Sequence, residues 1–399
     1  MKVMLVNTYY YPEIVGGAEY SVKKLAEGLK EAGEQVVVLC TGDSYASEEV
    51  DGIKIIRIKA MVPCRAVYAD KASSYKKAYR RLLDIWNIRN TRIIEEIIRA
   101  ERPNVIHTNG LYDISPVVWK VAKKHGVRVV HTLRDYFLPC PNVSLDCENN
   151  GGKCRFKYTL CPMHRKSNIK ALERYVDVLT APSAITLNKV LMVMGVRDIP
   201  GKVIPNAIDF DLDDIKKIYD LKNDSNSYPV KFVYLGTLSE KKGVYWLLES
   251  FEKVKNEDAE LYIAGKGELE NVVRDYCSMD SRIHFVGFLE EADMNQLLEK
   301  MHVLVCPSLW DEPFGRVVLD AYKHAMPVIA SKRGALSELV DDGKTGRLIE
   351  ANSQELCLAI ERYTDNPNII LDQSFDCIQK LKNYSIERQI NEFKSIYIA

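Results

Sequence analysis

The sequence has no apolar run long enough to cross a membrane, because a helical span needs about 20 consecutive apolar residues and every apolar run here is shorter. It also has no internal repeat and no low-complexity segment. The chain starts with the strand-like run KVMLVN, where a secretory signal would carry a basic segment and then an apolar one. We therefore expect a cytoplasmic protein that folds along its whole length.

Net charge is absent as well, since 55 basic and 55 acidic side chains cancel. The charges are unevenly distributed, however. Residues 1–200 carry 31 basic and 21 acidic side chains, and residues 201–399 carry 24 and 34. A basic first half is typical of a region that meets an anionic partner or surface. Two solvated faces without a partner are the alternative.

The chain is longer than one ordinary domain, and two series of short apolar runs separated by amphipathic helical patterns divide it. The first series comprises residues 2–7, 35–40, 53–58, 104–109, 128–133 and 177–182, and the second comprises 231–236, 260–265, 282–287, 302–307, 327–331 and 346–350. Such Val/Ile-rich runs between helices are typical of parallel strands buried on both faces. We predict an α/β fold with two Rossmann-like parallel-sheet domains facing each other across a cleft, in which ligands bind at the carboxyl ends of the strands.

The polar segment at residues 211–229 separates the two series and ends in Pro229, so a domain boundary is expected between residues 200 and 229. Residues 73–102 and 384–399 have apolar side chains at helical spacing. We predict that the terminal helix packs back onto one of the two sheets.

Residues 307–322, PSLWDEPFGRVVLDAY, follow a predicted strand and carry two acids eight positions apart. Gly315 and Arg316 open a helix whose first-turn amides attract anions, and a glycine there permits close backbone approach. Glu312 and Asp320 would bracket a ligand that holds both phosphate and hydroxyl groups, because carboxylates accept hydrogen bonds from vicinal diols. A capped helix with a solvated acid on its second turn is the alternative.

Two further strand ends carry anion-binding patterns. Gly16 and Gly17 precede a predicted helix, which favours anion binding but also fits an ordinary turn. After the first strand of the second series, Thr237 or Ser239 would cap a helix and Lys242 would lie at its positive end. A lysine there opposes the helix dipole, a conflict that either a bound phosphate or solvent resolves.

These motifs, taken in order, resemble those of the family 4 glycosyltransferases, which are retaining enzymes of the GT-B fold. The matching stretches run over essentially the whole chain and are YYPEIVGGAEYSVKKLAEGL, VIHTN, VVHTLRDYF, VIPNAIDF, YLGTLSEKKGVYWLLESF, LYIAGKGELE, FVGFLEEADMNQLLEKMHVLVCPSLWDEPFGRVVLDAYKHAMPVIAS and GALSELVDDGKTGRLIE. The resemblance implies an acceptor-binding domain, residues 1–204 with the terminal helix 384–399 crossing back to it. It also implies a nucleotide-sugar-binding domain, residues 205–383.

The resemblance further implies roles for residues at matching positions. Glu312, His131 and Lys242 are the expected catalytic residues: Glu312 lies beside the donor sugar, His131 near the transferred sugar, and Lys242 on the diphosphate. Asp320 is expected to bind the ribose hydroxyls. The other expected donor contacts, mostly through backbone groups, are Gly16, Gly17, Gly287, Phe288, Leu289, Phe314, Gly315 and Arg316.

Three positions depart from the family pattern. Asp320 replaces the usual glutamate and is one methylene shorter. Thr237, which we count among the donor-binding residues, stands where many members have the arginine of a G-R-L motif, so phosphate neutralisation falls on Lys242 and Arg316. On the acceptor side, Arg134 replaces the common histidine of a T-L-H-D-Y motif.

The resemblance therefore predicts a retaining hexosyltransferase. Its donor would be a UDP- or GDP-sugar, and its acceptor a hydroxyl of a glycan or glycolipid in the synthesis of cell-surface polysaccharide or glycoconjugate. The strand-end loops show no acidic cluster typical of a divalent-metal site, so we expect no cofactor for catalysis. We also expect no nucleic-acid partner. A sugar-nucleotide epimerase or hydrolase, and a non-catalytic sugar-nucleotide-binding protein, remain alternatives.

Four cysteines, Cys140, Cys147, Cys154 and Cys161, recur every seven residues in a segment whose Pro, Asn and Gly residues disfavour one continuous helix. Four thiols in a cytosolic loop favour a metal site over disulfides, but no pair has the CxxC spacing usual for zinc. A structural zinc or iron–sulfur site, unconnected thiols and disulfides stay open. We interpret the segment as a candidate lid over the acceptor site.

Residues 75–86, YKKAYRRLLDIW, set Lys76, Lys77, Arg80 and Arg81 against aromatic and leucine side chains at helical spacing. This pattern is typical of a helix on an anionic bilayer and equally of an ordinary surface helix. The first interpretation predicts peripheral contact with the cytoplasmic face of a membrane and a lipid-linked acceptor.

Overall fold

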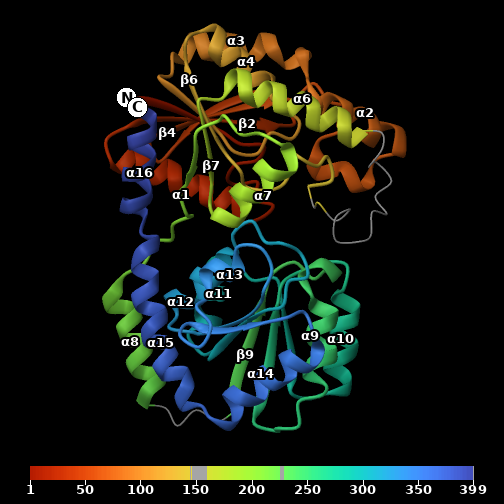
Figure 1. The fold of residues 1–399 in the computed structure, drawn as a ribbon, viewed down its shortest axis with the longest axis vertical. Helices are drawn as coiled ribbons and strands as arrows, with labels where there is room; N and C mark the ends of the chain where they lie inside the picture. Colours follow the sequence, from red (N-terminus) through yellow and green to blue (C-terminus); the bar gives the residue numbers. More distant parts are fainter. Residues whose placement is uncertain (144, 146–159, 225–228, 399) are drawn as a thin grey trace. The chain divides into compact units, whose positions relative to one another are not determined.

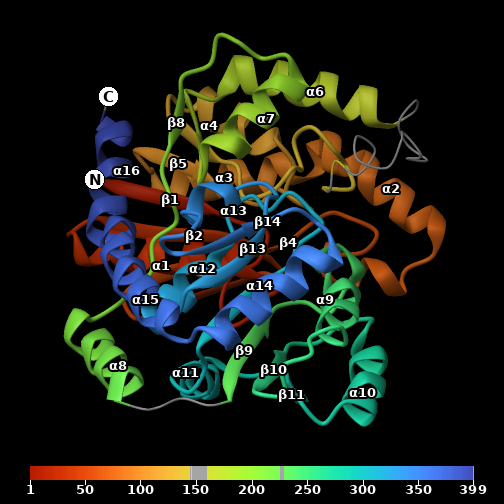
Figure 2. The ribbon, with the colours of Figure 1, turned by 60° about the horizontal axis from the view of Figure 1, so that its bottom comes forward.

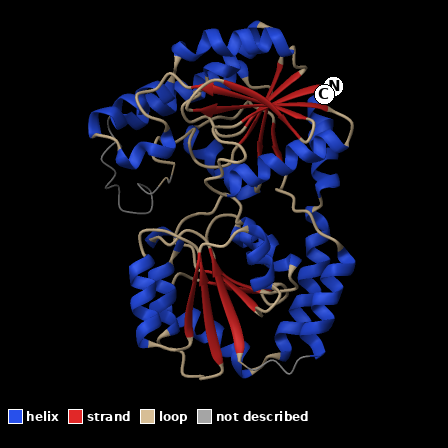
Figure 3. Ribbon diagram, turned by 180° about the vertical axis from the view of Figure 1, so that it is seen from behind, coloured by secondary structure: helices blue, strands red, loops and turns tan. Residues whose placement is uncertain are grey.

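The computed structural model describes residues 1–398 except 144, 146–159 and 225–228 (Figure 1). It divides into two compact units: residues 1–207 together with 386–399 form the first unit, and residues 208–385 form the second. Each unit is a sheet with helices on both of its faces (Figure 3).

The first unit contains an eight-stranded sheet with the order β3-β4-β2-β1-β5-β6-β7-β8. Its strands are β1 (Lys2–Val6), β2 (Gln35–Gly42), β3 (Ala46–Val50), β4 (Ile53–Lys59), β5 (Val105–Thr108), β6 (Arg128–Thr132), β7 (Val178–Ala181) and β8 (Gly201–Val203). All neighbours pair in parallel except β3 and β4, which form an antiparallel edge. The six predicted strands are present, and β3 and β8 are additional.

Helices cover both faces of this sheet. They are α1 (Gly17–Glu31), α2 (Ser74–Ile85), α3 (Thr91–Glu101), α4 (Val117–Lys124), α6 (Leu160–Tyr175), α7 (Ala184–Met194) and α16 (Ile386–Ile398). Helices α1 and α16 pack against each other on one face, and α3, α4 and α6 lie side by side on the other (Figure 1). Both faces of the central strands are therefore buried, as their Val/Ile-rich sequences predict.

The terminal helix α16 is joined to the first sheet by packing and by hydrogen bonds. The side chains of Phe393 and Tyr397 are buried in the same core as α1. Tyr397 Oη lies 2.7 Å from His107 Nδ1, and Arg128 Nε donates to the carbonyl of Ile396 at 2.8 Å. The predicted return of the chain end to the first domain is confirmed.

The second unit contains a six-stranded, fully parallel sheet with the order β11-β10-β9-β12-β13-β14. Its strands are β9 (Val230–Leu235), β10 (Ala259–Ala264), β11 (Ile283–Gly287), β12 (Val303–Cys306), β13 (Val328–Ser331) and β14 (Gly346–Ile349). Its helices are α8 (Leu212–Asp224), α9 (Val244–Phe251), α10 (Glu270–Met279), α11 (Glu291–Leu298), α12 (Arg316–Lys323), α13 (Leu336–Leu339), α14 (Ser353–Asp365) and α15 (Asn368–Leu381). Helices α9, α10 and α14 bury one face, and α8, α12 and α15 the other (Figure 2). All six predicted strands are confirmed.

Two helical segments differ from expectation. The polar segment that separates the two series of strands forms α8, which starts where the side chain of Asp211 accepts hydrogen bonds from the amides of Asp213 and Asp214. The long pattern at 73–102 is split into α2 and α3. Asn90 lies at this break, and its side chain donates to the carbonyl of Asp113. No helix in the described part of the chain is long and apolar enough to span a bilayer.

Candidate functional site

In the second unit the structure brings Lys242 and Glu312 into direct contact. Lys242 Nζ lies 2.6 Å from Glu312 Oε1, although the two residues are 70 positions apart. Ser308 Oγ donates to the same carboxylate oxygen at 2.8 Å, and Lys242 Nζ stands 5.1 Å from the centre of the Trp310 ring. The Glu312 side chain is 8% exposed, whereas that of Lys242 is 30% exposed. The ammonium group is thus oriented by a buried carboxylate and still accessible to a second anion.

Two glycines hold the loops that carry this pair. Gly243, with φ +74°, ends the single 3-10 turn Glu240–Lys242, and a Cβ there would lie 1.9 Å from the carbonyl oxygen of Pro307. Gly334, with φ +55°, would place a Cβ 2.4 Å from the carbonyl oxygen of Glu312. Because backbone lies against backbone at both points, the loops have little freedom to separate.

The helix α12 begins immediately after the Glu312 loop. Its N-cap is Gly315, whose φ of +95° lies in the left-handed region that favours glycine. Phe314 is buried, with its ring 6.2 Å from that of Tyr384. Gly315 therefore serves the turn into α12, and the first-turn amides of this helix are a potential binding site for an anion.

Asp320 lies further along α12, with 12% of its side chain exposed. Burial raises the pKa of its carboxyl, while the positive charges of Arg316 and Lys323 lower it. The Arg316 Nε lies 4.0 Å from Asp320 Oδ1, which is a loose ion pair. Such a carboxylate retains the capacity to accept hydrogen bonds from hydroxyl groups.

The segment after β9 differs from the helix expected there. Lys242 belongs to one 3-10 turn, and the Ser239 side chain makes no capping hydrogen bond. Thr237 is exposed, and its carbonyl accepts a hydrogen bond from the Tyr234 hydroxyl at 2.8 Å. Lys242 therefore reaches Glu312 from a tight turn that directly precedes α9, so it still lies at the positive end of a helix, whose N-cap is Gly243 and not Thr237 or Ser239.

The end of β11 carries the remaining expected donor contacts of this unit. Gly287 closes the strand with φ +77°. Phe288 is 55% exposed, and Lys266 Nζ lies 4.3 Å from the centre of its ring. Leu289 is half-buried. The carbonyl of Gly287 accepts the amide of Gly265, so β10 and β11 stay joined up to this point.

In the first unit Gly16 and Gly17 are exposed at the start of α1. The Gly16 amide already donates to Glu19 Oε2 at 2.7 Å. Burial raises the pKa of the Glu19 carboxyl, and its hydrogen bonds from backbone amides lower it. An anion bound at this helix start would have to share the Gly16 amide with Glu19 or use the amides that follow it.

His131 lies at the end of β6 with only 3% of its surface exposed. Its Nδ1 is 2.9 Å from Thr108 Oγ1, and its ring packs edge-on against Trp119 at 5.1 Å. Burial lowers the pKa of His131 to about 3, so the imidazole is neutral at physiological pH. These contacts fit a core histidine, and the catalytic role assigned to it stays a prediction.

Four residues that make contacts at these sites were not predicted: Ser308, Trp310, Asn109 and Asn206. Ser308 and Trp310 contact the Lys242–Glu312 pair. They could have been predicted, because both lie in the stretch 307–322 that also carries Glu312. The two asparagines that hold Arg134 come from loops far from it in the sequence, so no local sequence pattern predicts these contacts.

Two family models match the chain. The model described as Glycosyltransferase Family 4 matches residues 15–212, and the model described as Glycosyl transferases group 1 matches residues 229–366. Between them they span most of both units. The chain belongs to the family 4 glycosyltransferases.

Relatives of this glycosyltransferase match it over most of their length. An uncharacterized 42.6 kDa protein in the cps region of Klebsiella pneumoniae is 29% identical over 343 residues, covering 85% of this chain and 87% of that protein. An uncharacterized glycosyltransferase of Methanocaldococcus jannaschii is 25% identical over 363 residues, covering 85% and 83%. A glycogen synthase of Mycobacterium tuberculosis is 24% identical over 385 residues, covering 92% and 87%.

Solved structures share the fold of this glycosyltransferase. Sucrose-phosphate synthase from Thermosynechococcus elongatus has a TM-score of 0.76 and 19% identity, covering all of this chain and 98% of that one. An Anabaena protein in complex with UDP has a TM-score of 0.71 and 17% identity, covering 99% of both chains. At these identities the likeness shows the fold alone, and it confirms the predicted GT-B class.

The structure of this family 4 glycosyltransferase describes two of the four cysteines. Cys140 and Cys161 are buried and no disulfide joins these two described residues, whereas Cys147 and Cys154 lie outside the described residues. Within the described ranges no group of three or more His, Cys, Asp or Glu side chains could hold a metal ion. The metal site stays a prediction.

Proposed function

We propose that this enzyme transfers a hexosyl group from a UDP- or GDP-sugar to a hydroxyl of a glycan or glycolipid, with retention of the anomeric configuration. The observation that carries the proposal is the Lys242–Glu312 contact beside the start of α12. Cleaving a sugar–diphosphate bond develops negative charge on the diphosphate and positive charge on the sugar. Lys242 would stabilise the first, and the Glu312 carboxylate the second.

The proposed step balances without a cofactor. The bond between the anomeric carbon and the diphosphate oxygen breaks, and the acceptor oxygen forms the new glycosidic bond on the same face of the sugar. The acceptor proton passes to the departing phosphate, as the family resemblance implies. The amides that open α12 and the accessible ammonium of Lys242 would bind the diphosphate product.

Relatives support the choice of donor and process. One Anabaena structure of the same fold is a complex with UDP, and another is a complex with UDP-glucose. The Klebsiella relative is described by its place in a cps region, and the Mycobacterium relative is a glycogen synthase. These descriptions favour a UDP-sugar donor and a polysaccharide product for this chain.

The proposal is tested first by binding. Thermal shift with UDP, GDP, ADP and their sugar conjugates should raise the melting temperature with one nucleotide series, because a ligand specific for the folded state stabilises it by mass action. Lys242→Ala should abolish the shift. Lys241→Ala, which changes the exposed neighbour in the same turn, should retain it.

Turnover then separates the alternatives. A transferase should release little nucleotide until an acceptor is added, and NMR of the product should show the anomeric configuration of the donor. Complete consumption of the donor without an acceptor would favour a hydrolase or epimerase. Donor binding that survives Glu312→Ala with no turnover in either protein would favour a non-catalytic sugar-nucleotide-binding protein.

We also propose that α2 makes peripheral contact with an anionic membrane. Its Tyr75, Tyr79 and Leu82 side chains lie one to two turns apart and are 71%, 40% and 44% exposed, and Lys76 and Lys77 lie beside them. Aromatic and basic side chains together bind the interface of an anionic bilayer. In a flotation assay at low salt, the protein should float with phosphatidylglycerol liposomes. With phosphatidylcholine liposomes it should stay unbound at the bottom of the gradient. No flotation with either would remove this proposal and weaken the case for a lipid-linked acceptor.

The four-cysteine metal site is likewise a proposal. Elemental analysis of the purified protein should find about one zinc, or iron with sulfide, per chain, lost in Cys140→Ser and Cys161→Ser. A metal-free protein with fully titratable thiols would leave these residues as unconnected cysteines.

A further inference from the structure

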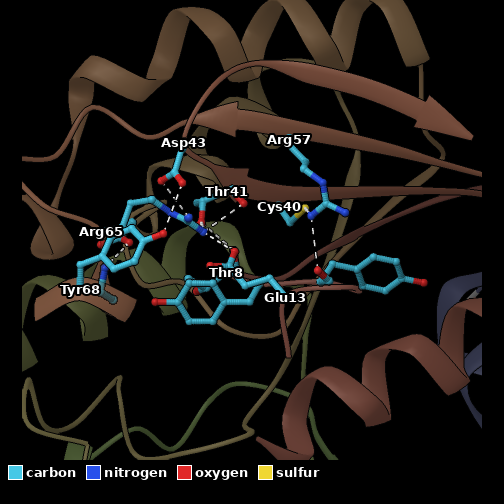
Figure 4. Close-up of polar contacts among 12 residues, drawn as sticks. Thr8, Glu13, Cys40, Thr41, Asp43, Arg57, Arg65 and Tyr68 are labelled. Atoms are coloured by element: carbon cyan, nitrogen blue, oxygen red, sulfur yellow. Dashed lines mark hydrogen bonds and ion pairs between the residues drawn. The ribbon is translucent and has the colours of Figure 1, made fainter. Parts of the chain in front are cut away.

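Arginines near the carboxyl edge of the first sheet differ in how their charge is balanced. Arg65 is neutralised twice: its Nη2 lies 2.5 Å from Glu13 Oε2, and its Nη1 lies 3.1 Å from Asp43 Oδ1. Figure 4 shows both acids turned toward the Arg65 guanidinium, together with Thr41 and Tyr68. This arginine ties loops of the unit together and has little charge left for a ligand.

Arg80 is balanced in the same way. Its Nη1 lies 2.8 Å from Asp84 Oδ2 and 3.6 Å from Asp113 Oδ1, and all three side chains are buried. Asp113 also accepts the amide of Ala66 at 2.7 Å. The pair of acids therefore holds Arg80 in a structural role.

Arg134 lacks such a partner. Within the described part of the chain, no carboxylate lies within ion-pair distance of its guanidinium. Its Nε donates to Asn109 Oδ1 at 2.9 Å, and its Nη1 donates to Asn206 Oδ1. Both asparagines are buried and neutral, and they follow β5 and β8 at the carboxyl edge of the sheet. They orient the guanidinium without reducing its charge.

The third guanidinium nitrogen of Arg134, Nη2, makes no hydrogen bond to the described residues. This nitrogen is also buried. Burial lowers the pKa of Arg134 to about 10, and Tyr397 and Glu19 raise it, so the side chain is still charged at neutral pH. A buried charge without a counter-ion destabilises the fold, and an unsatisfied donor adds to that cost. A purely structural arginine would be expected to have the carboxylates that Arg65 and Arg80 have.

We propose that Arg134 binds an anionic group, a carboxylate or phosphate, carried by the acceptor. The guanidinium fork matches such groups, and two asparagines hold it in place before the ligand arrives. Arg134 lies in the first unit, which the family resemblance assigns to the acceptor, whereas Lys242 in the second unit serves the diphosphate. The inference rests on the proposed transfer function and adds to it an acidic acceptor.

The test uses isothermal titration of the full chain and four proteins: wild type, Arg134→Gln, Arg134→Lys and the control Arg92→Gln. The Arg92 side chain is 91% exposed on α3, where it pairs with Glu96. Each protein is titrated with UDP and GDP. With the tighter nucleotide saturating, it is then titrated with glucose 6-phosphate, glucuronate and, as the neutral probe, glucose.

Wild type should bind at least one anionic sugar tenfold or more tightly than glucose. Arg134→Gln should lose that preference, Arg134→Lys should keep only part of it because the charge remains without the fork, and Arg92→Gln should keep all of it. Nucleotide affinity should stay within about twofold in all four. Because Arg134→Gln removes an uncompensated charge, its melting temperature without ligand should equal or exceed that of wild type. A merely structural arginine would instead lower it.

Three results would overturn the inference. Equal affinity of wild type for glucose and both anionic sugars would exclude an acceptor anion. A parallel loss of nucleotide affinity in Arg134→Gln would assign the anion to the donor. A large fall in the melting temperature of Arg134→Gln would assign Arg134 to the fold. If wild type binds neither UDP nor GDP, the proposed transfer function fails first, which is a separate outcome.

Discussion

The two units balance their buried charges in different ways. In the second unit Lys242 and Glu312 neutralise each other at 2.6 Å, and both are predicted to act on the same donor. In the first unit Arg65 and Arg80 each have two carboxylates, whereas the partners of Arg134 among the described residues are asparagine oxygens. A fully paired arginine fixes loops, whereas an unpaired one is prepared for an anion. Within the first unit, the counter-ions therefore distinguish the two arginines that fix loops from the one available to a substrate, whereas Lys242 has a single partner and keeps 30% of its side chain exposed.

Lys242→Ala removes the charge pairing of the second unit, because it leaves the Glu312 carboxylate buried without its cation. We expect kcat to fall about 10²- to 10³-fold, the range for removing one group that stabilises transition-state charge. Initial rates with the identified donor measure the effect. Lys241→Ala should retain near-normal turnover, and wild-type rates in Lys242→Ala would contradict the assignment.

Glu312→Gln keeps the size of the side chain and removes its charge. A loss of about 10²-fold in kcat is expected, with donor affinity changed much less, if the carboxylate acts mainly on the charge that develops in the sugar. The double variant Lys242→Ala/Glu312→Gln should lose far less than the product of the two single losses, because residues in contact are coupled. Strict multiplication of the losses would show that the two act independently.

Gly28→Leu tests how strongly the first unit depends on α16. A Cβ at Gly28 would lie 2.6 Å from Ile386 Cγ2 and 3.0 Å from Ile390, so a leucine must displace the terminal helix. We expect the free energy of unfolding to fall by about 1–3 kcal/mol, as is usual for overpacking. Gly126→Asn is the control, because that position is open and asparagine tolerates its positive φ. Urea unfolding followed by circular dichroism measures both, and equal midpoints would contradict tight packing.

The smallest predicted effect concerns acid stability. Since burial lowers the pKa of folded His131 to about 3, the unfolded histidine takes up a proton below pH 6.5 while the folded one does not. The free energy of unfolding should therefore fall as pH falls from 6.5 toward 3, by up to about 1.4 kcal/mol per pH unit from this residue. His131→Gln should make urea midpoints at pH 7, 6 and 5 less steeply dependent on pH. An unchanged slope would show that His131 is accessible to protons.

Much of the fold was predictable because its strands are apolar runs buried by parallel neighbours. Strand β3 was missed because its polar sequence ASEEV pairs only with β4 at an edge, and β8 because it has three residues. The break between α2 and α3 was missed for another reason. It depends on asparagine side chains that bond to the backbone of a loop more than 20 positions away.

Part of the candidate site could also be predicted from the sequence. The motifs place Lys242 and Glu312 at two strand ends of one sheet, so their proximity was expected. The turn that carries Lys242 was not, because Gly243 adopts its conformation against Pro307, a neighbour 64 positions away. The missing counter-ion of Arg134 also could not be read from the sequence. It follows from which side chains fold around it, and Asn206 comes from the last loop of the unit.

The position of α16 determines the order in which the two units can complete their folding during synthesis. The first unit takes Ile390, Phe393 and Tyr397 into its core, and Tyr397 bonds to His107 on the central strand β5. A ribosome delivers these residues only after the entire second unit has been synthesised. The second unit can therefore complete its fold before α16 is available to the first unit, whose sheet until then has one face partly uncovered. In this enzyme the first unit to emerge is the last to be finished.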